Sequence, residues 1–111
     1  MSAKFQIFKG TNSQHYFHLK AANGEIVLAS EGYTSEHNCR AGIDSVKINS
    51  MLDSRYKKLS SAKNEAYFTL HASNGQVIGT SEMYSSTQAR DHGIEVVKKH
   101  AANAPIEQSG Y

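Results

Sequence analysis

The stretch Tyr16-Phe17-His18-Leu19-Lys20-Ala21-Ala22-Asn23-Gly24 decides the fold, because the chain contains it twice. It returns from residue 67 as Tyr-Phe-Thr-Leu-His-Ala-Ser-Asn-Gly, and each copy is followed by a Ser-Glu-x-Tyr sequence. The offset between equivalent residues is 51 throughout, as 67 − 16 and 74 − 23 show. A constant offset indicates a duplicated supersecondary unit, and such units bury each other's apolar faces.

The length of the chain favours one domain built from both copies. With 111 residues there is room for one modest core, whereas two separate domains of about 50 residues would each be marginal. We therefore expect a single domain over residues 1–111, with one repeat over about residues 4–52 and the other over about residues 53–108.

Composition and charge indicate an ordinary globular protein. The hydrophobic content is 39% and the charged content is 20%, so the chain has enough apolar residues to fold. The net charge of +2 comes from scattered residues, which gives little support to a nucleic-acid-binding patch. A single cysteine, Cys39, cannot form an internal disulfide, and no apolar run has the roughly 18 residues of a membrane span. We expect a cytoplasmic protein with no signal peptide.

Asn23-Gly24 between two strand-like runs predicts a β-hairpin with a two-residue type I′ turn, in which both central residues have positive φ. The same holds for Asn74-Gly75. In this register three pairs face the core, namely Ala21 with Ile26, Leu19 with Leu28 and Phe17 with Ser30. The second copy places Phe68, Leu70, Ala72 and Val77 inward. The outward residues are Tyr16, His18, Lys20 and Val27 in the first copy and Tyr67, Thr69, His71 and Ile78 in the second.

The period of the apolar residues becomes helical after Tyr33 and after Tyr84. The first stripe is Cys39, Gly42, Ile43 and Val46, and the second is Gly93, Ile94, Val97 and Ala101. Ser85-x-x-Gln88 has the form of a capping box, and Thr34 supplies the equivalent N-cap hydroxyl. A glycine at the same helical place in both copies predicts a close approach of helix to sheet.

Three further segments read as strands, over residues 4–9, 55–61 and 106–108. Each unit is thus three strands followed by a helix. We expect an α+β domain with a mainly antiparallel sheet and both helices on one face.

The repeated Tyr-Phe-x-Leu-x-Ala-x-Asn-Gly, with Ser-Glu-x-Tyr-x-Ser and Gly-Ile-x-x-Val-Lys after it, resembles the YegP-like family of small, mostly bacterial proteins with a domain of unknown function. The resemblance runs from about Phe5 to about Lys99. It implies two tandem β(3)-α-β units that share one sheet and exchange their C-terminal strands. Residues 55–61 would then close the first unit while opening the second, and the chain would be a monomeric pseudo-dimer. The resemblance brings no established activity and no catalytic residues.

The histidines and the cysteine give weak signals for chemistry. His15 and His18 fall on opposite faces of a strand, so a shared metal ion would require a turn between them. Cys39 and His37 do not face each other on a helix, which favours Cys39 as a buried apolar side chain over an activated thiol. We assign no catalytic, cofactor-binding or metal-ligating residue and expect no cofactor.

The two Ser-Glu-x-Tyr turns form one candidate site, because free amide groups between a strand and a helix can bind a phosphate or carboxylate. Helix capping and packing explain the same residues and are favoured. The candidate anion-binding residues are Ser30, Glu31, Tyr33, Thr34, Ser35, Ser81, Glu82, Tyr84, Ser85 and Ser86.

The outward sheet face forms the second candidate site. It combines aromatic and basic side chains, as surfaces that bind single-stranded nucleic acid do. The candidates are Tyr16, His18, Lys20, Tyr67 and His71, with Lys57 or Lys58 nearby. No RNA-binding sequence motif accompanies them, so a solvated or protein-binding face is favoured.

These observations lead to one preferred function and two alternatives. We expect a non-enzymatic interaction or structural module whose partner is a protein rather than nucleic acid or a membrane. The alternatives are a nucleic-acid-binding protein that uses the sheet face, and an enzyme or small-anion binder at the Ser-Glu-x-Tyr turns.

Overall fold

The computed structural model describes residues 3–108. Within this range neither helix is long and apolar enough to cross a membrane. The elements in chain order are β1 (Lys4–Lys9), β2 (His15–Lys20), β3 (Ile26–Ala29), α1 (Glu36–Asn49), the 3-10 helix η1 (Asp53–Arg55), β4 (Tyr56–Ser60), β5 (Ala66–His71), β6 (Val77–Thr80), α2 (Thr87–His100), the 3-10 helix η2 (Ala101–Asn103) and β7 (Ile106–Gln108).

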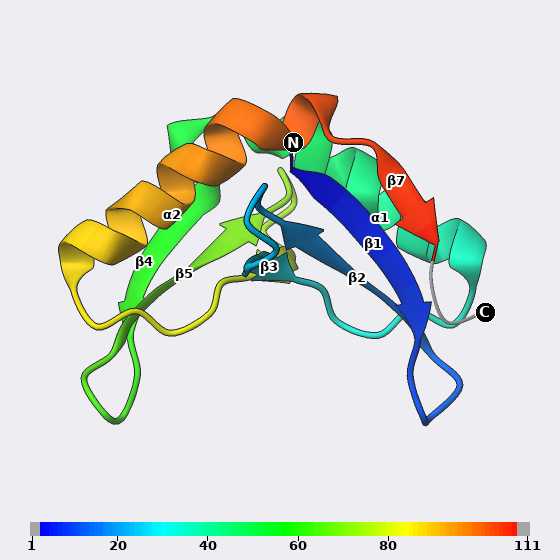
Figure 1. Cartoon of the computed structure of the whole chain (residues 1–111), viewed down its shortest axis with the longest axis horizontal. Helices are drawn as coiled ribbons and strands as arrows, with labels where there is room; N and C mark the ends of the chain where they lie inside the picture. The colour runs from blue at the N-terminus through cyan, green and yellow to red at the C-terminus, as the bar shows by residue number, and fades with distance from the viewer. Residues whose placement is uncertain (1–2, 109–111) are drawn as a thin grey trace.

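All the strands belong to one sheet, in the order β4-β5-β6-β3-β2-β1-β7 (Figure 1). Neighbouring strands are antiparallel except β1 and β7, which run parallel. β7 follows the helix of the second repeat but lies against the first strand of the first repeat. The α+β fold and the exchanged C-terminal strand predicted above are confirmed.

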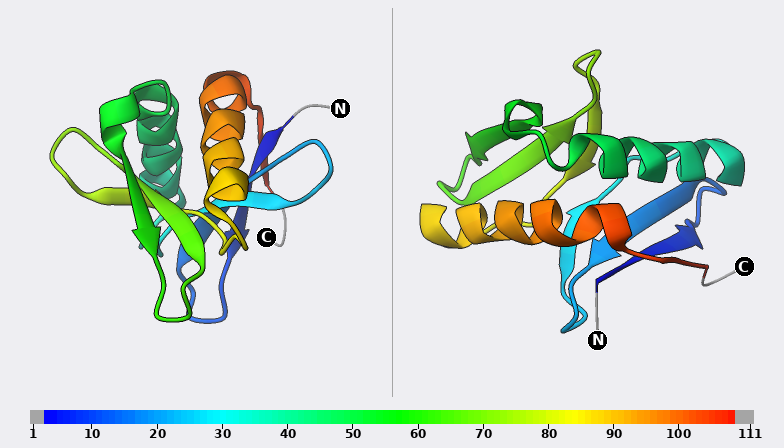
Figure 2. Two further views of the ribbon diagram at one scale, coloured as in Figure 1. Left: turned by 90° about the vertical axis from the view of Figure 1, so that its left-hand side faces the viewer. Right: turned by 90° about the horizontal axis from the view of Figure 1, so that it is seen from above.

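The two repeats meet at a pseudo-twofold axis between β3 and β6. Ala29 pairs there with Thr80, its own equivalent in the second copy, since 80 − 29 is 51. The two helices run in opposite directions over the same face of the sheet (Figure 2). Each helix also contacts strands of the other repeat, α1 with β5 and β6 and α2 with β3. The repeats therefore share one core.

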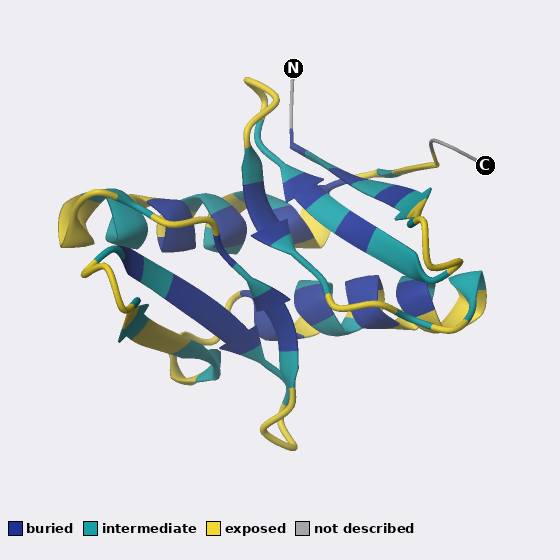
Figure 3. Ribbon diagram, turned by 90° about the horizontal axis from the view of Figure 1, so that it is seen from below, coloured by how far each residue is buried: buried dark blue, intermediate teal, exposed yellow. Residues whose placement is uncertain are grey.

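The predicted helical stripes lie in this core. Every residue of both stripes is buried, and the largest fully buried side chains come from both repeats, as the dark bands on strands and helices show (Figure 3). They include Phe5, Ile7, Phe17, Leu19, Leu28, Ile43, Phe68 and Leu70.

The predicted type I′ turn is wrong in both hairpins. Within these two turns only the glycines, Gly24 and Gly75, have positive φ, at 87° each. Gly24 N donates to Ala21 O at 2.9 Å, and Ala21 N donates to Glu25 O at 2.9 Å. The loop therefore has three residues, a turn centred on Ala22 and Asn23 followed by a left-handed glycine.

A β-bulge then restores the predicted register. Lys20, rather than Ala21, lies opposite Ile26, but one position further along Leu19 pairs with Leu28 as predicted. Val27 is the extra residue, and β6 has the same irregularity at Ile78. Bulged residues leave the strict alternation of faces, which is why the outward placement of Val27 and Ile78 is wrong. Both belong to the buried core.

Three further predictions need correction. Thr69 lies on the outward face with His71, whose Nε2 is 2.7 Å from Thr69 Oγ1, but it is buried there rather than in contact with water. The helix N-caps are Ser35 and Ser86, one residue after the predicted Thr34 and Ser85. Adjacent hydroxyl residues can each serve as a cap, and the backbone path through the turn selects the second.

The predicted close approach at Gly42 and Gly93 is confirmed. A Cβ atom on Gly42 would lie 2.3 Å from Tyr33 Oη, and one on Gly93 would lie 2.4 Å from Tyr84 Oη. The tyrosine of each Ser-Glu-x-Tyr turn therefore packs under the helix of its own repeat, and only glycine leaves it room.

Candidate functional site

The two outer strands of the sheet differ in what covers them. β1 has β7 on its outer side, with Phe5 N donating to Pro105 O at 2.8 Å. β4 is the equivalent strand of the second repeat, since 56 − 5 is 51, and among residues 3–108 it pairs only with β5. By symmetry, each helix should be followed by a last strand, here called the exit strand, that pairs with the first strand of the other repeat, as β7 does with β1. The segment after α1 instead becomes β4 itself, so no strand of residues 3–108 remains to pair with the outer side of β4. β4 is an open edge.

The backbone groups on this edge follow from the pairing of β5. Phe68 N donates to Ser81 Oγ at 2.9 Å, and Ser81 N donates to Phe68 O at 2.9 Å. Both main-chain groups of Phe68 thus point toward β6, and those of Lys58, which lies opposite, point away from β5. Ser60 lies opposite Ala66, which exchanges both of its bonds with Tyr84. Lys58 and Ser60 therefore present N–H and C=O groups to the open edge.

Side chains at equivalent positions of β1 and β4 differ in their exposure to solvent. On β1, which pairs with β7, Phe5 and Ile7 are 0% exposed and belong to the core. Their equivalents on β4 are Tyr56, which is half-buried, and Lys58, whose side chain is 55% exposed. An exposed lysine on an edge strand is typical of edges that remain unpaired in the free protein.

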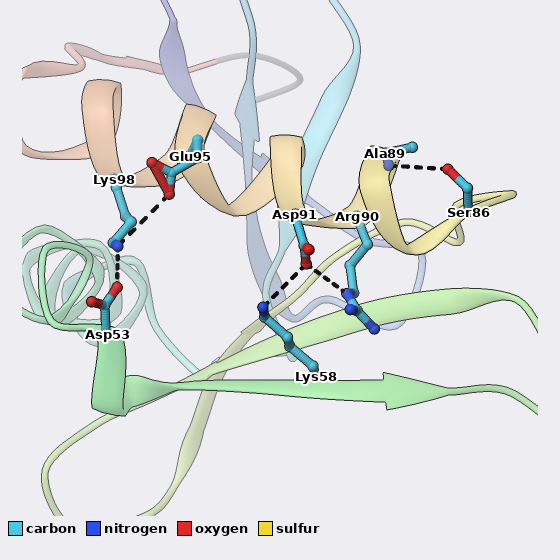
Figure 4. A network of polar contacts seen from close by, with 8 residues as sticks. All are labelled: Asp53, Lys58, Ser86, Ala89, Arg90, Asp91, Glu95 and Lys98. Atoms are coloured by element: carbon cyan, nitrogen blue, oxygen red, sulfur yellow. Dashed lines mark hydrogen bonds and ion pairs between the residues drawn. The ribbon is translucent and has the colours of Figure 1, made fainter.

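A groove of about 620 Å³ lies between β4 and α2. It is lined by Asp53, Tyr56, Lys58, Asp91, Ile94, Glu95 and Lys98. Two ion pairs connect its walls, Lys58 with Asp91 at 3.3 Å and Lys98 with Asp53 (Figure 4). Arg90 also contacts Asp91, at 3.1 Å, and the two cations hold the pKa of Asp91 below its usual value despite desolvation. The Lys58–Asp91 pair is exposed on both partners, so it contributes little stability and can rearrange around a ligand.

Tyr56 forms part of the groove wall and fixes the start of β4. Its hydroxyl donates to Ser50 O at 2.6 Å, which joins the strand to the end of α1. Burial raises the pKa of Tyr56 well above its ordinary value, and the nearby acids Asp53 and Glu95 raise it further. The hydroxyl is therefore neutral at physiological pH and acts as a donor.

The other side of β4 carries unpaired positive charge. A second hollow of about 500 Å³ lies there, between β4 and the end of β5, with Arg55, Lys57 and His71 in its lining. Arg55 donates from Nε to Asn49 Oδ1 at 2.9 Å. Among the ion pairs of residues 3–108, none involves Lys57 or Arg55. β4 is thus an edge strand with a hollow on each side and free cationic groups beside it.

The predicted anion-binding turns use most of their polar groups internally. Ser30 Oγ accepts from Phe17 N at 2.9 Å and donates to Glu31 O, and Ser81 Oγ does the same with Phe68 N and Glu82 O. Each serine completes the hydrogen bonding of a central strand.

The remaining turn residues divide between capping, packing and exposure. Ser35 Oγ and Ser86 Oγ accept from helix amides at 3.1 Å and 3.0 Å. Burial raises the pKa of both turn tyrosines, which pack under the helices. Five of the candidate residues are exposed, namely Glu31, Thr34, Glu82, Ser85 and the cap residue Ser86. A hollow of only about 110 Å³ adjoins Tyr84, so anion binding at these turns stays a prediction with little space to support it.

The predicted sheet-face residues fall into two separate groups. Tyr16, His18 and Lys20 lie on β2, whereas Tyr67 and His71 lie on β5, with β3 and β6 between them. Three strand spacings are about 14 Å, so the groups do not form one stacking platform. The Phe8 ring lies 5.7 Å from the Tyr16 ring and 4.6 Å from the His18 ring. Desolvation and the charge of Lys20 lower the pKa of His18.

Neither metal binding nor thiol chemistry finds support in the described part of the chain. Among residues 3–108 no group of three or more His, Cys, Asp or Glu side chains could hold a metal ion. Cys39 is buried, and burial raises the pKa of its thiol to about 11. A thiol with so high a pKa is almost entirely protonated at neutral pH and is a poor nucleophile.

Comparison with known proteins places the chain in a family. The model of a family described as "Domain of unknown function (DUF1508)" matches twice, over residues 11–56 and 61–108. The chain belongs to the DUF1508 family. UPF0339 proteins are its relatives: one from Bordetella pertussis is 49% identical over 107 residues, covering 96% of each chain. The UPF0339 protein YegP of Escherichia coli O157:H7 is 40% identical, covering 98% of this chain and 99% of its own.

Solved structures of DUF1508 relatives share the fold. The solution structure of a UPF0339 protein from Shewanella oneidensis has a TM-score of 0.91 at 44% identity, covering 97% of this chain and 92% of its own. That of YegP from E. coli, described as a protein of unknown function, has a TM-score of 0.93 at 39% identity, covering 99% and 95%. The names of these relatives indicate neither catalysis nor nucleic-acid binding.

The open edge was missed in the sequence, although a signal for it exists. The repeat pattern makes residues 55–61 both the last strand of the first unit and the first strand of the second. Two units of four strands each therefore supply seven strands rather than eight, and one strand position must be empty. The second signal is Lys58, which occupies the position equivalent to the buried Ile7. A lysine is unusual at a strand position that is buried.

Proposed function

We propose that the protein is a non-enzymatic interaction module that binds an extended segment of a protein partner as an added strand on β4. The observation that carries this proposal is the empty strand position itself. β7 fills the equivalent position on β1, and β4 has no such neighbour among residues 3–108. Strand addition takes its affinity from main-chain hydrogen bonds and its specificity from side-chain hollows beside the edge. β4 offers both.

We also propose that the protein acts as a monomer in the cytoplasm. A free, buried Cys39 supports a reducing compartment. The internal pseudo-symmetry supports a monomer, because the second repeat already supplies the core that a second subunit would provide. The separation of the aromatic and basic groups on the sheet face favours a protein partner over nucleic acid.

The binding experiment uses a peptide that contains the sequence of β7 as the probe. A capped synthetic peptide of residues 103–108, Asn-Ala-Pro-Ile-Glu-Gln, is titrated into the ¹⁵N-labelled full chain. We expect saturable shifts of the Lys58 amide signal, with a Kd of about 1 mM for so short a peptide. The β1 amides should not change, because the tethered β7 outcompetes a free peptide.

A pair of methylated peptides supplies the matched control. In β7 the carbonyl of Pro105 accepts from Phe5, so Glu107, two residues on, also directs its main-chain groups toward β1. N-methylation of the peptide's glutamate should abolish binding, and N-methylation of its final glutamine should leave it unchanged. The absence of saturable shifts along β4 would overturn the proposed function, as would equal binding by both methylated peptides.

A further inference from the structure

The filled edge of the sheet shows what a strand at the open edge must provide. β7 runs parallel to β1 with Ile106 beside Phe5, Glu107 beside Gln6 and Gln108 beside Ile7. Ile106 packs against the core on the helix side, and Glu107 pairs with Lys4 at 3.1 Å on the other side. β7 therefore presents an apolar residue to the helix and an acid to the cation two residues back on the edge strand.

The same two requirements exist at β4. On the helix side, the groove wall includes Tyr56 and Ile94, the equivalents of Phe5 and Ile43, and an apolar side chain fits there. On the other side, Arg55 is the equivalent of Lys4, and Lys57 replaces the neutral Gln6. An acid at the central position of the added strand would lie beside Lys57 and two residues from Arg55. The open edge thus favours an acid more strongly than the filled edge does.

The charge of a third residue, Lys58, opposes pairing between two copies of this chain. Two β4 edges that paired around a twofold axis at Lys58 would place that lysine opposite its counterpart, and like charges directly opposite each other destabilise a sheet. Lysines on edge strands commonly prevent self-association in this way. Pairing of two copies in this register is therefore disfavoured.

We infer that β4 binds a segment that runs parallel to it, with an apolar residue over Tyr56 and Ile94 followed by Asp or Glu beside Lys57. This inference rests on the proposed strand addition and adds the direction and the chemical class of the bound segment. The partner is a protein that exposes an extended apolar-acidic sequence.

Peptides with a nitroxide at one end test the direction. A nitroxide on the N-terminus of the peptide of residues 103–108 should broaden the amide signals of residues 51–53, at the start of β4. A nitroxide on its C-terminus should broaden those of residues 63–65, in the turn after β4. The reverse pattern would overturn the parallel direction while leaving strand addition in place, whereas no broadening near β4 would overturn both.

Charge exchange tests the chemical class. Replacing the peptide's glutamate by lysine should weaken binding to the wild-type chain about tenfold, and Lys57→Glu in the protein should restore it. Lys99→Glu makes the same charge change on an exposed part of α2 outside the groove, and it should restore nothing. Equal affinity of both peptides for the wild-type chain would overturn the acidic preference. Sedimentation that shows dimers dependent on Lys58 would overturn the inference that pairing of two copies is disfavoured.

Discussion

Gly42 in α1 and Gly93 in α2 each lie over the tyrosine of their own repeat. Replacing a helical glycine by alanine normally stabilises a protein by about 1 kcal/mol, but here the new Cβ would lie 2.7 Å from Tyr33 Cζ or 2.9 Å from Tyr84 Cζ. We expect Gly42→Ala and Gly93→Ala to lower the free energy of unfolding by about 1–3 kcal/mol, measured by urea denaturation. Ala41→Gly, at an exposed position of α1, gives the ordinary helical preference as a control. A more stable Gly42→Ala or Gly93→Ala variant would show that the tyrosines move aside freely.

Ser81 tests whether the Ser-Glu-x-Tyr turns serve the fold. Its hydroxyl accepts from the amide of Phe68, a fully buried residue. Ser81→Ala leaves that amide without its partner, so we expect a loss of about 1–3 kcal/mol in unfolding free energy. Ser30→Ala should cost less because Ser30 is only half-buried. A Ser81→Ala variant as stable as the wild type would contradict the structural role and would strengthen the case for a binding turn.

At the scale of elements, Tyr56 joins β4 to the end of α1 and makes this junction sensitive to alkaline pH. Its folded pKa is raised above that of an unfolded tyrosine, which is about 10. Its contribution to stability is therefore complete below pH 10 and is lost as the pH rises through the folded pKa. Tyr56→Phe should cost about 1 kcal/mol at pH 7 by removing the bond to Ser50. It should then lose less further stability than the wild type between pH 9 and 11, measured by urea denaturation. Equal alkaline losses in the two proteins would contradict this assignment.

The elements themselves were largely predictable from the sequence, and the reasons for the misses are local. The pairing of Leu19 with Leu28 was predicted from a two-residue loop, yet the loop has three residues. The prediction held because the bulge at Val27 cancels the extra loop residue. Neither the three-residue loop nor the bulge has a strong signature in sequence. An Asn-Gly pair suits both the two-residue and the three-residue loop, and bulges follow from backbone twist.

The candidate site was less predictable than the fold. Side-chain types identify candidate residues such as Tyr16 and Tyr67, but only the strand order shows that two strands separate them. The open edge depends on a missing neighbour, which no single residue encodes. Lys58, at the position equivalent to Ile7, indicates the open edge, but only after the two repeats have been aligned.

At the scale of the whole molecule, fusion of the repeats permits asymmetry that a dimer of identical units would not. Leu28 and Gly79 are equivalent residues, since 79 − 28 is 51, and they meet at the pseudo-twofold axis. A Cβ on Gly79 would lie 2.6 Å from Leu28 Cγ and Cδ2, so two large side chains would not fit there. We expect Gly79→Ala to cost about 1–3 kcal/mol in urea denaturation, and Leu28→Ala in the same chain to recover part of that loss. Additive losses in the double variant would show that the two sites do not interact.

The open edge is the second asymmetry, and a proline at Lys58 tests it most directly. Because the Lys58 amide faces the edge rather than β5, Lys58→Pro removes the donor of an added strand without breaking the existing sheet. Lys58→Ala is the matched control, since it removes the same side chain and keeps the amide. Both variants are titrated with the peptide of residues 103–108 and followed by the amide signals of β4, after a thermal melt has shown that each is folded. We predict that Lys58→Ala binds within about threefold of the wild type and that Lys58→Pro binds at least tenfold more weakly. If a folded Lys58→Pro variant binds the peptide as well as Lys58→Ala does, strand addition at β4 is wrong.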